Sequence, residues 1–176
     1  MNKRLKVILQ NAVYTALYVV LCIVFQPISY GAVQVRIAEA LCIMPLFDEF
    51  AVISVTLGCF IANVYNGNPI DAIFGTLATF IGLYAIRFIK FDKPYVAITE
   101  KIKIDVFFIK MFPSILSNAI IVPLILKYAY SENMPLILSG TYVAIGEIIS
   151  IYLIGYLLNN ALKKLDLPFA NKELNK

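Results

Sequence analysis

The chain has 176 residues, of which 61% are hydrophobic and 15% charged, and its mean hydropathy is +0.82. A soluble domain is about half apolar and about a quarter charged, so this composition predicts a lipid bilayer as the main solvent. It excludes a secreted disulfide scaffold, a nucleic-acid binder and an ordinary cytosolic enzyme. The net charge of +4 needs no acidic partner if the basic residues flank a membrane. The absence of His excludes imidazole catalysis and imidazole metal ligation.

Apolar stretches predict an all-α polytopic membrane protein with six transmembrane helices. A helix needs about 20 apolar residues to cross roughly 30 Å of hydrocarbon. The expected spans, in chain order, are 9–26, 37–47, 50–64, 70–86, 104–127 and 136–160. The second and third are short, so residues 37–64 could instead form one interrupted span.

The distribution of Lys and Arg decides between six spans and five, because cytoplasmic segments carry an excess of both. Six spans with both termini cytoplasmic place most basic residues inside, including those of the 87–103 loop and the C-terminal tail. Five spans would turn both segments outward and reverse the bias. We therefore expect one integral membrane domain over 1–176, without a Gly-rich phosphate loop and hence without ATPase activity of its own.

Two polar residues lie deep in expected spans. Glu147 interrupts the otherwise uncharged stretch 136–158, about 16 Å from its start at ~1.5 Å per residue. Asn118 lies at a similar depth in the antiparallel span before it, so the two side chains can share a level. A charge at the bilayer centre costs about 2.5–3.5 kcal/mol on insertion scales, which favours a ligand site. A helix–helix hydrogen bond or a protonated Glu is the structural alternative.

Four more polar residues lie near the expected outer ends of the spans: Arg36, Glu39, Asn63 and Asp71. With Glu147 they give a net charge of −2 if all are ionised, which suits a small cationic ligand rich in hydrogen-bond donors. Each also has a local explanation. Arg36 and Glu39 could form an ion pair at a helix start, Asn63 could be a helix C-cap, and Asp71 could complement a helix dipole. The inner half is expected to lack a comparable polar line.

Ala12 and Ala16 in the first span form a small-xxx-small pair. Small residues four apart let another helix approach closely, so this face is a candidate contact for a partner. Packing within the chain explains the pair equally well, and the motif alone is weak.

Several runs together resemble the QueT family, in the family's order and over most of the chain. They are residues 34–41 (QVRIAEAL) followed by Pro45, 58–63 (GCFIAN), 71–79 (DAIFGTLAT), 117–119 (SNA) and 142–147 (YVAIGE). The resemblance implies a substrate-binding (S) component of an energy-coupling factor (ECF) transporter in the cell membrane. It also implies an outward-facing pocket, a transmembrane coupling protein and two cytoplasmic ATPases as partners, and no cofactor. Ala12 and Ala16 match the motif by which S components dock the coupling protein.

The family's expected substrate is a queuosine precursor, 7-aminomethyl-7-deazaguanine. Carboxylates suit its ammonium group and the donors of its guanine-like edge, an Asn amide can donate and accept, and a Tyr can stack on the ring. The expected substrate-binding residues are Gln34, Arg36, Glu39, Asn63, Asp71, Asn118, Tyr142 and Glu147, with Tyr30 as a second stacking candidate.

Other functions remain open from the sequence. The chain could be an S component for another small cationic vitamin or nucleobase-like compound. A self-sufficient secondary transporter would need a polar route to the inner face or paired repeats with broken helices, and a membrane scaffold would need no pocket. An enzyme is not expected, because no nucleophile, base or metal set is evident.

Overall fold

The computed structural model describes residues 2–29, 35–67, 69–91, 93–97, 103–131 and 133–165. Its elements, in chain order, are α1 (Lys3–Val24), α2 (Gln26–Ser29), the 3₁₀ helix η1 (Ile37–Leu46), α3 (Ala51–Tyr65), the π-helical segment η2 (Asp71–Gly75), α4 (Thr76–Ile86), β1 (Tyr95–Ala97), β2 (Lys103–Asp105), α5 (Val106–Tyr128), α6 (Leu136–Glu147), the π-helical segment η3 (Ile148–Gly155) and α7 (Tyr156–Lys164).

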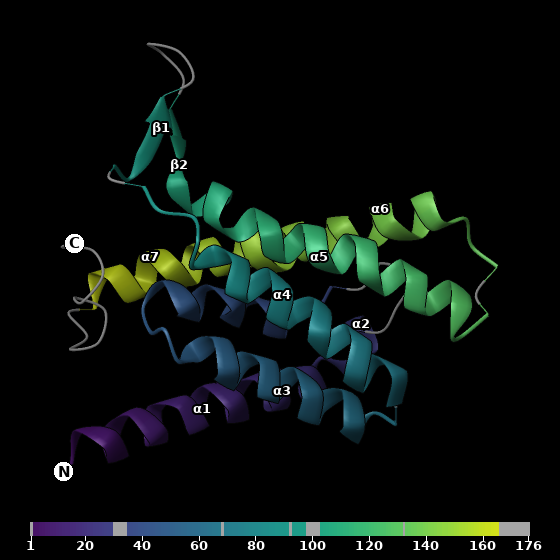
Figure 1. Cartoon of the computed structure of the whole chain (residues 1–176), viewed down its shortest axis with the longest axis horizontal. Helices are drawn as coiled ribbons and strands as arrows, with labels where there is room; N and C mark the ends of the chain where they lie inside the picture. Colours follow the sequence, from purple (N-terminus) through teal and green to yellow (C-terminus); the bar gives the residue numbers. More distant parts are fainter. Residues whose placement is uncertain are drawn as a thin grey trace.

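The helices run back and forth along one bundle axis (Figure 1). Within the described residues, three helices are long and apolar enough to cross a membrane: 4–24, 106–128 and the continuous helix 136–164 formed by α6, η3 and α7. The expected spans 37–47, 50–64 and 70–86 correspond to shorter apolar helices of 10–17 residues. The all-α class is thus confirmed, and the helical segments fall where the sequence predicts them.

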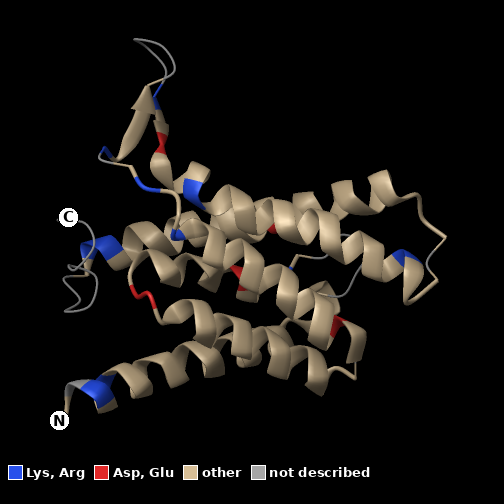
Figure 2. Ribbon diagram, viewed as in Figure 1, with Lys and Arg blue, Asp and Glu red and all other residues tan. Residues whose placement is uncertain are grey.

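One end of the bundle is strongly basic. Helix α1 begins and α7 ends there, and the β1–β2 hairpin projects from it (Figure 1), with Lys and Arg gathered around it (Figure 2). We call this end of the bundle the basic end. The opposite end is the one at which α3 terminates and α6 begins. The hairpin, in which Tyr95 pairs with Asp105, was not expected from the sequence.

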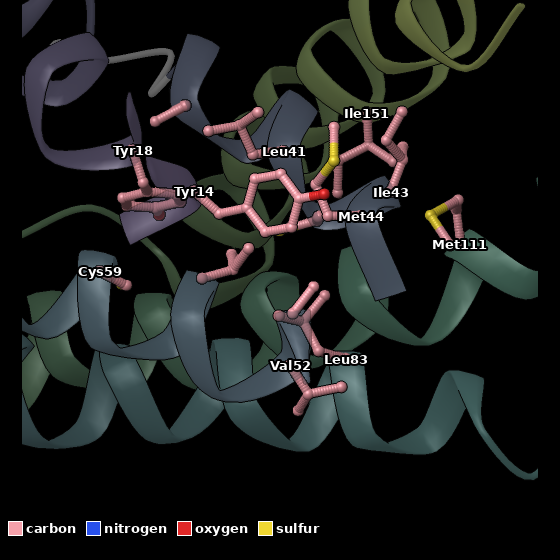
Figure 3. Packing of buried hydrophobic residues seen from close by; sticks show 14 of the residues in the cluster. Tyr14, Tyr18, Leu41, Ile43, Met44, Val52, Cys59, Leu83, Met111 and Ile151 are labelled. Carbon is pink, nitrogen blue, oxygen red and sulfur yellow. The ribbon is translucent and has the colours of Figure 1, made fainter. Parts of the chain in front are cut away.

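The core is built around η1, with contributions from α1, α3, α4, α5 and η3. Tyr18, Ile43, Leu83, Met111 and Ile151 are among its largest fully buried side chains (Figure 3). The outward faces of the helices are also apolar, and Ile137 is 87% exposed. Apolar surface on both sides of a helix is typical of a bundle that faces lipid.

Small residues let α4 and α5 approach each other closely. A Cβ built at Gly82 would lie 2.5 Å from the Cα of Ser114 on α5, whereas one at Gly75 would meet nothing nearer than 3.6 Å. Ala78 and Thr79 are buried on the same stripe. The stripe of α4 that contains Ala78, Thr79 and Gly82 is therefore a packing face.

A polar network lies near the basic end, the end that the sequence predicts to be the inner one and to lack a polar line. Asn11 and Gln10 on α1 donate to Oδ2 of Asp48 at 3.0 and 3.3 Å, and Ser54 on α3 donates to Oδ1 of Asn11. The sequence pattern missed it because these residues sit in three separate segments that are only weakly polar by themselves. These contacts hold α1 to α3 and are satisfied within the protein.

The contact at Gly82 predicts a stability effect. Gly82→Ala should destabilise the protein by about 1–3 kcal/mol, the usual cost of overpacking, because the added methyl group meets backbone atoms of α5. Thermal unfolding in detergent measures this as a lower Tm. Gly75→Ala, on the same helical passage, is the matched control and should leave Tm nearly unchanged; equal shifts would contradict the packing argument.

Candidate functional site

Glu147 and Asn118 meet inside the bundle. Helices α5 and α6 pack against each other, and Nδ2 of Asn118 donates a hydrogen bond of 3.0 Å to Oε1 of Glu147. Both side chains are buried, 3% and 4% exposed. The second carboxylate oxygen, Oε2 of Glu147, is buried and has no hydrogen-bond partner among the described residues. The structure therefore brings the two together as predicted, and leaves one strong acceptor unused.

Asp71 provides a second unused acceptor. Its Oδ1 atom is buried and has no partner within the described part of the chain. Asp71 opens the π-helical segment η2, and Glu147 immediately precedes η3. Segments with π-type bonding occur rarely and frequently at functional sites, because they re-aim side chains within a helix. The two open carboxylate oxygens are thus both placed at such irregularities.

Arg36 connects these two acids electrostatically. It precedes η1, is 7% exposed, and attracts the carboxylates of both Glu147 and Asp71. A buried guanidinium between carboxylates offsets part of their desolvation cost. The site therefore combines one buried guanidinium with the buried carboxyl groups of Glu147 and Asp71.

Glu39 has a different role from the other acids. It is completely buried, and its two oxygens accept hydrogen bonds from Tyr18 (2.5 Å) and from the thiol of Cys42 (2.7 Å). Arg36 has an extended backbone outside η1, so the three-residue spacing expected to align it with Glu39 on a helix does not apply. Both carboxylate oxygens of Glu39 are thus satisfied by its neighbours.

Asn63 ties α3 to the start of η2. Its Nδ2 atom donates to the backbone carbonyl of Asp71 at 3.1 Å. The C-cap of α3 is Asn66, so the alternative of a cap at position 63 is wrong. A Cβ added to Gly75 would lie 3.6 Å from both Nδ2 of Asn63 and Oδ1 of Asp71, which places these two polar groups around one point.

Tyr130, which the sequence did not single out, lies beside Asp71. It makes a hydrogen bond with the Asp71 backbone; burial, and then the negative charge of Asp71, raise the pKa of its hydroxyl. It therefore stays protonated at neutral pH and can donate. Tyr142 is half-buried, and no hydrogen bond of the described residues joins it to the cluster. Gln34 and Tyr30 lie outside the described residues.

Sequence patterns also missed Tyr18 and Cys42 as partners of Glu39, because both lie in apolar stretches and nothing distinguishes Tyr18 from the other ten tyrosines.

Cavities of about 540 and 190 Å³ lie elsewhere, and neither is lined by Glu147, Asn118 or Asp71. The polar cluster itself, with its two open oxygens, marks the candidate site. Among the described residues, no group of three or more His, Cys, Asp or Glu side chains is placed to hold a metal ion.

Comparisons with known proteins agree with this arrangement. The family model described as QueT transporter matches residues 8–164, which include every passage of the bundle. The queuosine precursor transporter QueT of Lactococcus lactis subsp. cremoris (strain MG1363) is 31% identical over 160 residues, 89% of this chain and 92% of the relative. No solved structure matches the chain significantly. With its long apolar helices it is a multi-pass protein of the cell membrane, and it belongs to the QueT transporter family.

Proposed function

We propose that the chain is the substrate-capture (S) subunit of an ECF-type importer and binds 7-aminomethyl-7-deazaguanine. The observation that carries this proposal is the buried Asn118–Glu147 pair with Oε2 of Glu147 open. The name of the Lactococcus lactis relative, a queuosine precursor transporter, supports this substrate class.

The chemistry of the ligand complements that of the cluster. The ligand carries a cationic primary amine at one side and a guanine-like edge with N–H donors and a carbonyl at the other. Oε2 of Glu147 and Oδ1 of Asp71 are two separate acceptors, and charge-assisted hydrogen bonds to carboxylates are roughly twice as strong as neutral ones. Asn118 can donate and accept, and Arg36 can donate to the ligand carbonyl.

The orientation follows from the charges at the two ends. If the basic end faces the cytoplasm, as the positive-inside rule favours, the chain makes six passages with both termini inside. Asp71 and Tyr130 then lie toward the outer surface, so the ligand is captured from outside. Inward delivery is assigned to a transmembrane coupling protein driven by two cytoplasmic ATPases.

The surface of α1 supports the assignment of the coupling protein. Ala12 and Ala16 are both exposed, so packing within this chain does not account for their small size. Close approach of a helix from another subunit does account for it. These two residues are the proposed docking positions.

A comparison of two ligands tests the proposed specificity. Detergent-purified protein should bind 7-aminomethyl-7-deazaguanine more tightly than the nitrile analogue by more than about fivefold, because the nitrile lacks the cation that a buried carboxylate pairs with. Isothermal titration calorimetry suits a chain without Trp. Equal affinities would contradict recognition of the amine by a carboxylate.

Substitution of the central acid tests the site. Glu147→Gln should weaken binding of the amine ligand by more than about 1 kcal/mol, because a desolvated charged hydrogen bond is lost. Glu49→Gln makes the same chemical change in an exposed ion pair with Arg87 at the basic end and should leave the affinity unchanged. Thermal unfolding shows whether the Glu147 variant is folded. If a folded variant binds the ligand with unaltered affinity, Glu147 is not part of the site.

A third variant tests the partner. Ala12→Leu should reduce co-purification with the coupling protein severalfold and leave ligand binding intact, because the larger side chain blocks close helix approach. Ala161→Leu, the same change at another exposed alanine, is the control and should assemble normally. Uptake into liposomes by the chain alone, without the ATPases, would instead favour a secondary transporter.

A further inference from the structure

A second candidate site lies at the basic end, away from the substrate cluster. A cavity of about 540 Å³ opens there between the end of α4, the hairpin, the start of α5 and α7. Small-molecule sites have volumes of about 300–1,000 Å³, so this cavity can hold a ligand group. None of the residues assigned to substrate binding lines it.

The cavity has an excess of positive charge. Its two acids are already engaged: Glu49 pairs with Arg87 at 3.0 Å, and Asp105 accepts a hydrogen bond of 2.9 Å from the Phe107 backbone at the start of α5. Four lysines also line it: Lys90, Lys93, Lys110 and Lys163. None of them forms an ion pair with a carboxylate in the described ranges. Their charges are therefore available to an anion.

Asn159 provides a second, independent indication of a ligand. It lines the same cavity from α7, is completely buried, and its Oδ1 atom has no hydrogen-bond partner among the described residues. A buried polar atom without a partner costs free energy unless a ligand or water satisfies it. A ligand that carries hydroxyl groups next to its anion would satisfy both Asn159 and the lysines.

The position of the cavity indicates where such an anion comes from. Its walls include the ends of apolar helices, and nearby Phe88 and Phe91 expose their rings, as expected at a membrane–water interface. The positive-inside rule explains why lysines lie at this end of the bundle. It does not explain why lysines from separate elements line the same cavity. Basic pockets between transmembrane helices on the cytoplasmic side bind anionic lipid headgroups.

We propose that this cavity binds the phosphate group of an anionic membrane phospholipid, with the lysines holding the phosphate and Asn159 accepting from a headgroup hydroxyl. Free inorganic phosphate offers the same anionic group, so the experiment must separate the two sources. The site does not depend on the identity of the transported substrate.

The test uses the full chain, delipidated in neutral detergent. Phosphatidylglycerol should be retained in native mass spectra and raise Tm, phosphatidylcholine should bind at least about tenfold more weakly, and millimolar inorganic phosphate should neither raise Tm nor displace the lipid. Equal binding of the two lipids would overturn the proposal. Stabilisation by inorganic phosphate without retention of phosphatidylglycerol would overturn the lipid as the source.

Matched double variants separate the cavity from general surface charge. Lys90→Gln/Lys110→Gln should weaken phosphatidylglycerol binding by about fivefold or more. Lys6→Gln/Lys164→Gln removes the same charge at the same end but outside the cavity and should have little effect. Equal losses of phosphatidylglycerol binding in both double variants would show non-specific attraction and overturn the proposal. The four substituted lysines are all at least partly exposed, so both variants are expected to fold.

Discussion

The arrangement of this protein depends on how an apolar bundle accommodates buried carboxylates. Taking a charge out of water is costly unless hydrogen bonds and opposite charges compensate. Glu39 meets this requirement completely through Tyr18 and Cys42, whereas Glu147 meets it for one oxygen only, through Asn118. Arg36 compensates electrostatically for Glu147 and Asp71. The proposed ligand site rests on this difference between the satisfied acid and the two acids that each keep an open oxygen.

The two ends of the bundle differ chemically. Toward the opposite end, an acidic cluster lies among closely packed helices; at the basic end, lysines surround a hollow. Between them, small residues such as Gly82 keep the helices in close contact. The two sites that we propose, one for a solute and one for a lipid headgroup, therefore lie in chemically different parts of the bundle.

Sequence patterns predicted the helical segments well. Long apolar runs bounded by Pro, Gly and charged residues can hardly satisfy their backbone hydrogen bonds in lipid except as helices. They also predicted the meeting of Glu147 with Asn118, since antiparallel helices bring equal depths together. They did not predict that Arg36 lies outside η1 or that Tyr130 lies beside Asp71. Nor did they predict that the Oδ1 atom of Asn159 has no hydrogen-bond partner among the described residues. These features depend on the local backbone and on contacts between elements remote in sequence, which periodicity does not contain.

The π-helical segment η3 has a consequence for the last helix as a whole. Bonding from i to i+5 in place of i to i+4 inserts residues into the turn, so the residues of α7 are rotated about the helix axis relative to those of α6. The α6 part directs Glu147 toward α5, while Gly155, where η3 ends, packs on Ile43 of η1. One continuous helix thus presents Glu147 to α5 at one level and Gly155 to η1 at another.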